Sequence, residues 1–107
     1  MTYKATEVTI VTEKVSQEQI VAIIEAEGAT GYTVIEGSGK GRHGLRTHAR
    51  PSVAGDAFDI VKIEVILANR AAAERIAEQV ADQLFTYYSG IVYLEEVEIL
   101  RRSRFGE

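Results

Sequence analysis

A glycine-rich basic stretch, residues 37–55, holds the side chains of this 107-residue chain that are best suited to bind an anion. It contains four cations, five of the nine glycines, the only proline and no carboxylate, so the window carries +4 and the rest of the chain −8. Glycines let backbone N–H groups converge, and Lys40, Arg42 and Arg46 add charged donors for a phosphate or carboxylate. From composition alone, a solvated loop is an equal alternative.

Two further groups of donors lie near the C-terminal end. Arg101, Arg102 and Arg104 are able to clamp an oxygen-rich group, although a basic frayed terminus is the better interpretation of these three alone. The turn at Ser89 and Gly90 offers free backbone N–H groups, but a plain helix stop is the better interpretation of this turn alone.

Several function classes are disfavoured. His43 and His48 have no third ligand nearby, no nucleophile-elbow signature is present, and the chain has no cysteine. We therefore expect no enzyme activity, metal or cofactor. A pI near 5.2 and a loop without aromatic residues count against nucleic-acid binding. Without a long apolar run or a signal peptide, a cytoplasmic protein is expected.

The hydrophobic pattern predicts a single domain over residues 1–107 with six elements. Strands are expected over 7–12, 31–36, 57–67 and 91–100, the last with Val97 and Ile99 inward. A capping box at Ser16 and Gln19 predicts a first helix that ends at Gly28, and Asn69 predicts the start of a second that ends at Ser89-Gly90. The expected buried stripes are Ile20, Ile23, Ile24 and Ala26 on the first helix, and Ala73, Ile76, Ala77, Val80, Ala81, Leu84 and Tyr88 on the second.

The order β-α-β-β-α-β predicts an α+β, ferredoxin-like fold with a long loop between strands 2 and 3. Two helices would cover one face of the sheet. The other face would carry Phe58, Ile60 and Ile66 and would be bare in a monomer. An exposed apolar sheet face favours association with further copies, so an oligomer is expected.

Four segments carry a resemblance to a known family: Val11-Thr12-Glu13-Lys14, Gly31-Tyr32-Thr33-Val34, Gly39-Lys40-Gly41 with Arg46, and Tyr88-Ser89-Gly90-Ile91. Through them the chain resembles the PII signal-transduction proteins over roughly residues 7 to 101. Within these it is similar to the PII-like proteins associated with bicarbonate transport (SbtB) and with carboxysome operons.

The resemblance implies a homotrimer that binds adenine nucleotides, with ADP or AMP favoured over ATP, in clefts between subunits. A flexible T-loop over about 37–56 would fold over the phosphates and signal to a target such as a bicarbonate transporter or a carboxysome-linked partner. That partner would bring the cytoplasmic protein to a membrane or carboxysome, and residues 101–107 would form a basic tail. Bicarbonate is implied as a second ligand at Lys40, Gly41 and Arg46. The nucleotide-binding residues implied are Thr33, Gly39, Lys40, Gly41, Arg46, Lys62, Ile66, Ser89, Gly90, Ile91, Arg101 and Arg102.

The chain also departs from the proteins that it resembles. The loop has no tyrosine, so it has no acceptor for the uridylylation known in some PII proteins, and the tail has no cysteines for a redox switch. The main alternative is a ferredoxin-like regulatory module that binds an amino acid through strand edges. RNA binding through the loop and a weak nucleotide hydrolase rank lower.

Overall fold

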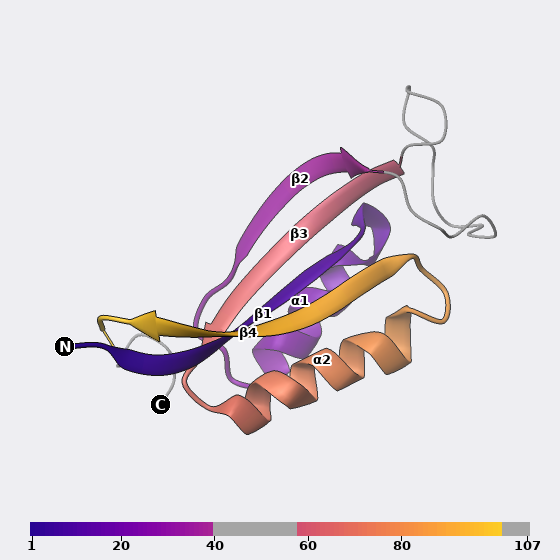
Figure 1. Ribbon diagram of the computed structural model, residues 1–107. Helices are drawn as coiled ribbons and strands as arrows, with labels where there is room; N and C mark the ends of the chain where they lie inside the picture. Colours follow the sequence, from indigo (N-terminus) through magenta and orange to yellow (C-terminus); the bar gives the residue numbers. More distant parts are fainter. Residues whose placement is uncertain (40–57, 102–107) are drawn as a thin grey trace.

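The computed structural model describes residues 1–39 and 58–101, and shows the expected element order. Most of the basic loop and the tail from 102 onward lie outside the described residues. Both helices pack on one face of a four-stranded sheet (Figure 1). The elements are β1 (Tyr3–Glu13), a 3-10 turn η1 (Lys14–Ser16), α1 (Gln17–Ala26), β2 (Thr33–Gly39), β3 (Phe58–Leu67), α2 (Arg70–Leu84) and β4 (Gly90–Ile99).

The sheet has the order β2-β3-β1-β4, and every neighbouring pair is antiparallel. The ferredoxin-like prediction is therefore confirmed. The central strands β1 and β3 are hydrogen-bonded on both sides, whereas β2 and β4 form the two edges. The core lies between the sheet and the helices because alternate residues of β3 point into it. Its fully buried members include Val8, Ile10, Ile20, Ile24, Val61, Ile63, Ile76 and Val80.

No helix covers the opposite face of the sheet (Figure 1). Ile35, Ile91 and Tyr93 on the edge strands are 51%, 57% and 39% exposed there, and Ile60 and Ile66 on β3 are half-buried. The side chain of Phe58 lies outside the described residues. An apolar face of this kind is what an oligomer would bury, and the oligomer itself stays a prediction.

The helix ends confirm two signals and correct one. Asn69 caps α2, because its Oδ1 accepts the backbone N–H of Ala72 at 3.1 Å, and Gly28 ends α1 with a φ of 87°. The capping box at Ser16 is wrong. The 3-10 turn η1 precedes α1, and the Ser16 hydroxyl donates back to the carbonyl of Glu13 at 3.0 Å, so it caps no helical N–H.

Other predicted details also need correction. β1 is longer than predicted, and β2 is shifted by two to three residues toward the loop. Ala26 is exposed because it lies on the outer side of α1. The second helix ends at Leu84, well before Ser89, because the amides of Tyr87 and Tyr88 both bond to the Leu84 carbonyl and tighten the chain into a turn.

On β4, Val92 and Leu94 are the residues that pack against the core. The expectation that Val97 faces inward is wrong, because it pairs with Ala5 on the face without helices and is half-buried. Ile99 is buried, but it has the same parity as Val97 and lies on that same face opposite Tyr3, so its predicted inward direction is wrong too. The error is one of phase, since a shift of one residue exchanges the two faces of a strand.

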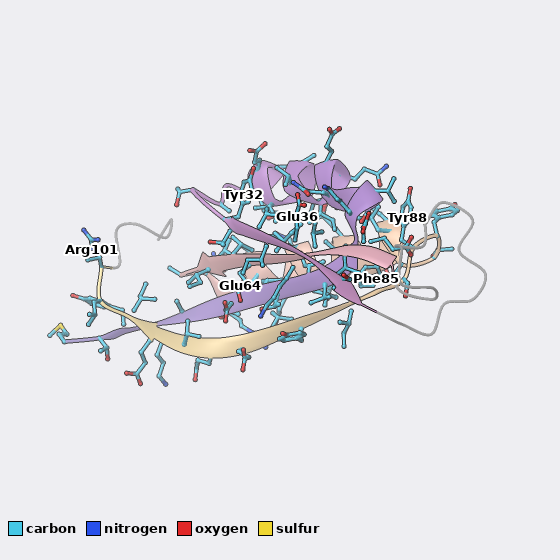
Figure 2. All side chains as sticks on the ribbon, turned by 90° about the horizontal axis from the view of Figure 1, so that it is seen from above. Tyr32, Glu36, Glu64, Phe85, Tyr88 and Arg101 are labelled. Atoms are coloured by element: carbon cyan, nitrogen blue, oxygen red, sulfur yellow. The ribbon has the colours of Figure 1, made fainter. Side chains whose placement is uncertain are left out.

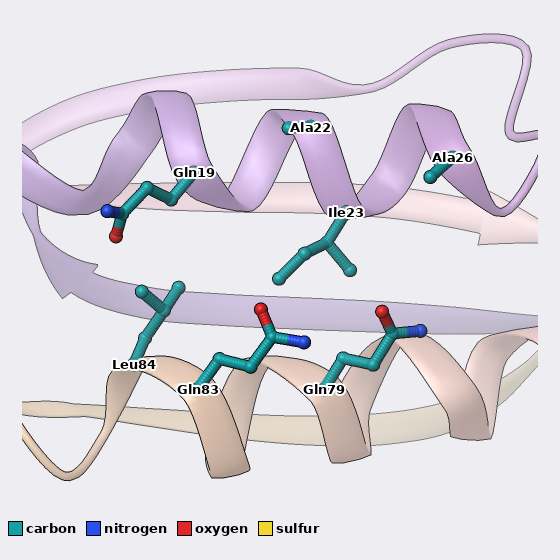
Figure 3. A pocket seen from close by; sticks show the side chains of 7 residues that line it. All are labelled: Gln19, Ala22, Ile23, Ala26, Gln79, Gln83 and Leu84. Atoms are coloured by element: carbon teal, nitrogen blue, oxygen red, sulfur yellow. The ribbon is translucent and has the colours of Figure 1, made fainter.

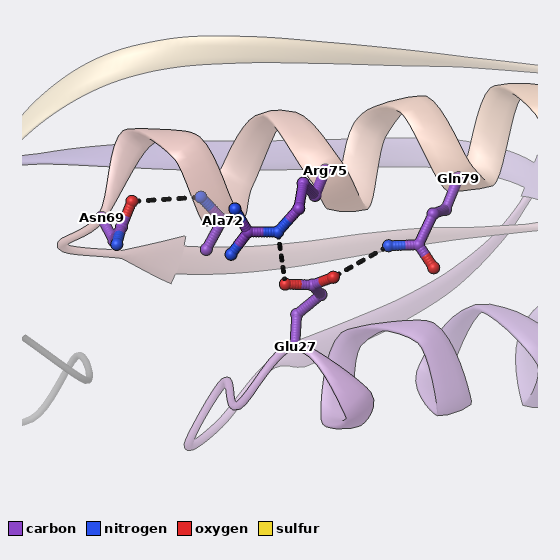
Figure 4. A network of polar contacts seen from close by, with 5 residues as sticks. All are labelled: Glu27, Asn69, Ala72, Arg75 and Gln79. Carbon is purple, nitrogen blue, oxygen red and sulfur yellow. Dashed lines mark hydrogen bonds and ion pairs between the residues drawn. The ribbon is translucent and has the colours of Figure 1, made fainter.

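A polar network ties the end of α1 to α2 (Figure 4). The Glu27 carboxylate accepts from Arg75 Nε and from Gln79 Nε2, each at 3.0 Å. These contacts join the two helices directly, in addition to the packing of each helix on the sheet.

Candidate functional site

A hollow of about 290 Å³ lies at the start of β2, where this edge strand meets the end of β3. Thr33 and Ile66, two of the residues predicted to bind nucleotide, line it. Thr33 is the first residue of β2 and is exposed, and Ile66 is half-buried on the face without helices. The remaining lining residues are Glu7, Thr30, Gly31, Tyr32 and Glu64.

The floor of the hollow is acidic. Desolvation raises the pKa of Glu7, the carboxylates of Glu64 and Glu95 raise it further, and Lys62 opposes them. Lys62 is itself paired with Glu64, with 3.4 Å between Nζ and Oε2. Two carboxylates beside an aliphatic wall suit a flat apolar group that carries amino donors.

The turn before β4 lies at the opposite end of the strands and is locked in place. Thr12 Oγ1 donates to the carbonyl of Ser89 at 2.8 Å, and the N–H of Ser89 donates to Oε2 of Glu13. Gly90 has no room for a side chain, because a Cβ there would lie 2.6 Å from Cε1 of Phe85 and 2.8 Å from the Thr12 hydroxyl. The tight turn therefore depends on glycine.

Three other predicted residues lie toward the same end as this turn. Gly39 is the last residue of β2, where the basic loop leaves the sheet. Lys62 and Ile91 belong to neighbouring cross-strand pairs on the face without helices, since both pair with Val11 of β1. Lys40, Gly41, Arg46 and Arg102 lie outside the described residues.

Arg101 follows β4 at the other end of the molecule, far from Tyr88 and the Ser89 turn (Figure 2). The register explains this, because β4 runs antiparallel to β1 and Ile99 pairs with Tyr3, near the chain start. Arg101 is exposed. It therefore lies with the Thr33 end of the sheet and not with the root of the loop.

The predicted site residues thus form two separate groups within one chain. Thr33 of β2 lies opposite Glu64 of β3, which lies opposite Thr9 of β1. Gly90, on the far edge strand β4, lies opposite Thr12 of β1. With about 3.4 Å per residue along a strand and about 4.8 Å between strands, Thr33 and Ser89 lie roughly 20 Å apart. One chain does not bring the hollow and the turn into contact with the same small ligand.

Sequence reasoning missed several residues at both ends. Glu7 and Glu64 appeared only as polar positions on alternating strands, and nothing in the pattern indicated that they share a hollow. Glu13 was part of the segment that carried the resemblance but received no role. Its signal was an acid at the last position of a buried central strand, where a carboxylate needs a partner.

A second hollow, of about 390 Å³, lies between the two helices on the outer surface (Figure 3). It contains none of the predicted site residues. Alanines and the amide side chains of three glutamines, with no charged group, make up most of its lining: Gln19, Ala22, Ile23, Ala26, Gln79, Gln83 and Leu84. It offers little to fix the orientation of an anion.

Within residues 1–39 and 58–101, no group of three or more His, Cys, Asp or Glu side chains is arranged to hold a metal ion. In the same ranges, no helix has the length and apolar character needed to cross a membrane.

The four-stranded antiparallel sheet with two helices on one face defines a small domain of the ferredoxin-like class. Residues 5–106 match the sequence profile of the family "Nitrogen regulatory protein P-II". The chain belongs to this family, as the four sequence segments had indicated.

Solved structures agree with this assignment. A protein of Thermus thermophilus, provisionally named as PII-like and signalling, is 28% identical, with 97% of each chain covered and a TM-score of 0.76. CPII from Thiomonas intermedia, bound to ADP and bicarbonate, gives 23% identity, coverage of 98% and 97%, and a TM-score of 0.77. The same protein bound to ADP, AMP and acetate gives 16% identity, coverage of 100% and 99%, and a TM-score of 0.79. At these sequence identities, the structural likeness to CPII supports the fold of this chain alone.

Proposed function

We propose that this chain is a PII-like regulatory sensor that binds adenine nucleotides, ADP or AMP before ATP, together with bicarbonate. The sites are clefts between the subunits of a homotrimer. The protein acts as a sensor and not as an enzyme, and it reports energy and inorganic-carbon status to a target such as a bicarbonate transporter. It works in the cytoplasm and reaches a membrane or carboxysome only through that target.

The observation that carries the proposal is the division of the site residues between opposite edges of the sheet. Thr33 lies on edge strand β2, and Ser89 immediately precedes edge strand β4. Their separation exceeds the length of an extended ADP molecule. One ligand contacts both only when the β2 edge of one copy lies beside the turn of another, which is the head-to-tail contact that closes a ring.

The hollow at the start of β2 has the apolar surface and the hydrogen-bond acceptors that an adenine base requires. Ile66 offers an apolar surface for the ring, and Glu7 and Glu64 accept hydrogen bonds from an exocyclic amine. The turn of the neighbouring copy would supply backbone N–H groups to the phosphates, and Arg101 would add a cation. CPII, which is similar in fold, binds ADP, AMP and bicarbonate, and this supports the choice of ligands.

Signalling follows from the position of the loop. Residues 37–55 leave the sheet at Gly39, at the end where the phosphates are placed, and they carry Lys40, Gly41 and Arg46. Contacts of these residues with phosphate and bicarbonate would be available only in one loop arrangement. A ligand that binds one arrangement better shifts the population toward it, and a partner then recognises that surface.

The experiment is isothermal titration of the protein with ADP, AMP and ATP, each with and without bicarbonate. We expect micromolar nucleotide binding that bicarbonate strengthens, with the reciprocal effect of nucleotide on bicarbonate affinity. Ile66→Ala should weaken ADP binding about 5- to 30-fold, because roughly 1–2 kcal/mol of apolar contact with the base is lost.

Val21→Ala is the matched control, since Val21 is half-buried on α1 and does not line the hollow. It should leave ADP affinity unchanged. Nucleotide binding that ignores bicarbonate would remove the inorganic-carbon role. Absence of binding to all three nucleotides would refute the proposal as a whole.

A further inference from the structure

Glu13 is the one buried Asp or Glu in the part of the chain that the structure describes, with 3% of the residue exposed. It is the last residue of β1. Its Oε2 accepts the backbone N–H of Ser89, and its Oε1 has no hydrogen-bond partner among the described residues. A buried carboxylate oxygen without a donor is costly, so this arrangement calls for an explanation.

The described cations near this end of the sheet are paired elsewhere. Lys14, the next residue, is exposed and bonds to Glu36 at 3.1 Å. Lys62 pairs with Glu64. The carboxylate of Glu13 is therefore stabilised mainly by one hydrogen bond from a backbone amide, as a bound anion is stabilised at a turn.

The Ser89 amide is also fixed in direction. The hydroxyl of Thr12 holds the carbonyl of Ser89, and the close packing of Gly90 against Phe85 leaves the turn little freedom. A backbone N–H has one hydrogen, so it serves one strong acceptor at a time. The carboxylate already occupies the donor that the proposed function assigns to a phosphate.

We propose that Glu13 is a specificity-determining residue whose carboxylate holds the Ser89 N–H in the free protein and must be displaced by an incoming phosphate. The inference rests on the proposed function and adds a penalty that grows with the negative charge of the ligand. Glu13 thereby discriminates against highly charged polyphosphates and leaves the affinity for the uncharged nucleoside unaffected. Displacement also breaks one of the two side-chain hydrogen bonds between β1 and the turn before β4, and leaves the one from Thr12 to the Ser89 carbonyl.

The test compares the wild type with Glu13→Gln, which keeps the shape and an oxygen acceptor but removes the charge. Titrations use adenosine, AMP and ADP. Glu13→Gln should bind ADP on the order of tenfold more tightly, AMP less so, and adenosine as the wild type does. The matched control, Glu36→Gln, removes an exposed charge at the same end and should change all three affinities little.

An ADP affinity that is unchanged or weaker in Glu13→Gln would overturn the inference, as would an equal gain for adenosine. A second measurement follows the Ser89 amide by NMR during titration with inorganic pyrophosphate. Its resonance should move in the wild type, and at lower pyrophosphate concentration in Glu13→Gln. An amide that pyrophosphate leaves unmoved would overturn the inference even if the variant failed to fold.

These outcomes separate the two proposals. If the wild type binds no nucleotide but pyrophosphate shifts Ser89 more readily in Glu13→Gln, the inference stands and the proposed function falls. If nucleotides bind and perturb Thr33, Ile66 and Ser89, but Glu13→Gln binds ADP no more tightly than the wild type, the proposed function stands and the inference falls.

Discussion

Gly90→Ala tests how far the turn before β4 depends on glycine. The added methyl would lie 2.6 Å and 2.8 Å from two ring carbons of Phe85 and 2.8 Å from the Thr12 hydroxyl, all closer than real Cβ contacts allow. Relief of such overpacking costs about 1–3 kcal/mol. Loss of the hydrogen bond from Thr12 to Ser89 costs about 1 kcal/mol more. We therefore expect a lower free energy of unfolding by roughly 2–4 kcal/mol.

The assay is urea denaturation at one fixed protein concentration, because association would make stability depend on concentration. Gly37→Ala is the matched control: it also lies in an edge strand, and a Cβ there would meet nothing within 4 Å. It should be neutral or slightly stabilising. The double change Gly90→Ala with Phe85→Leu should recover part of the loss. Equal midpoints for Gly90→Ala and Gly37→Ala would refute the packing argument.

Three further predictions concern stability. Asn69→Ala removes the cap of α2 and should cost about 1 kcal/mol in urea denaturation, whereas Asn69→Asp should retain most of it. Glu7→Gln should stabilise the protein near neutral pH, because the pKa of Glu7 is raised on folding. The gain should vanish as the pH falls through that raised pKa to below the ordinary value of 4.5. A stability difference between the variant and the wild type that did not change with pH would contradict this prediction. Gly28→Ala should cost about 1–2 kcal/mol for backbone reasons alone, because φ is 87° and the space is open; Gly31→Ala, without that φ, should not.

The sequence predicted the fold well because the strongest signals were periodic. The alternation of Val61, Ile63 and Val65 on β3 fixed which face meets the helices, and Asn69 and Gly28 marked helix ends by local chemistry. Local signals failed where tertiary contacts decided the outcome. Ser16 had the pattern of a capping box, but its hydroxyl bonds back to Glu13 because the chain forms a 3-10 turn first.

The site was predictable only in part. Glycines and cations indicated an anion, and the resemblance joined scattered residues into one site. The sheet register then separated that set into two ends of the molecule, which no spacing in the sequence showed. The partnership of Glu13 with Ser89 joins positions 76 residues apart, and neither residue by itself indicated the other.

The central claim is that one site uses the hollow of one copy and the turn end of another, and subunit mixing tests it most directly. Thr33→Arg would block the hollow, and Ile91→Glu would place a charge at the turn end; both residues are exposed, so both variants should fold. Each variant alone should lose ADP binding. When the two are unfolded together and refolded as an equal mixture, about a quarter of the interfaces should combine an intact hollow with an intact turn end and bind ADP again. A mixture that binds no more ADP than either variant alone would contradict the account.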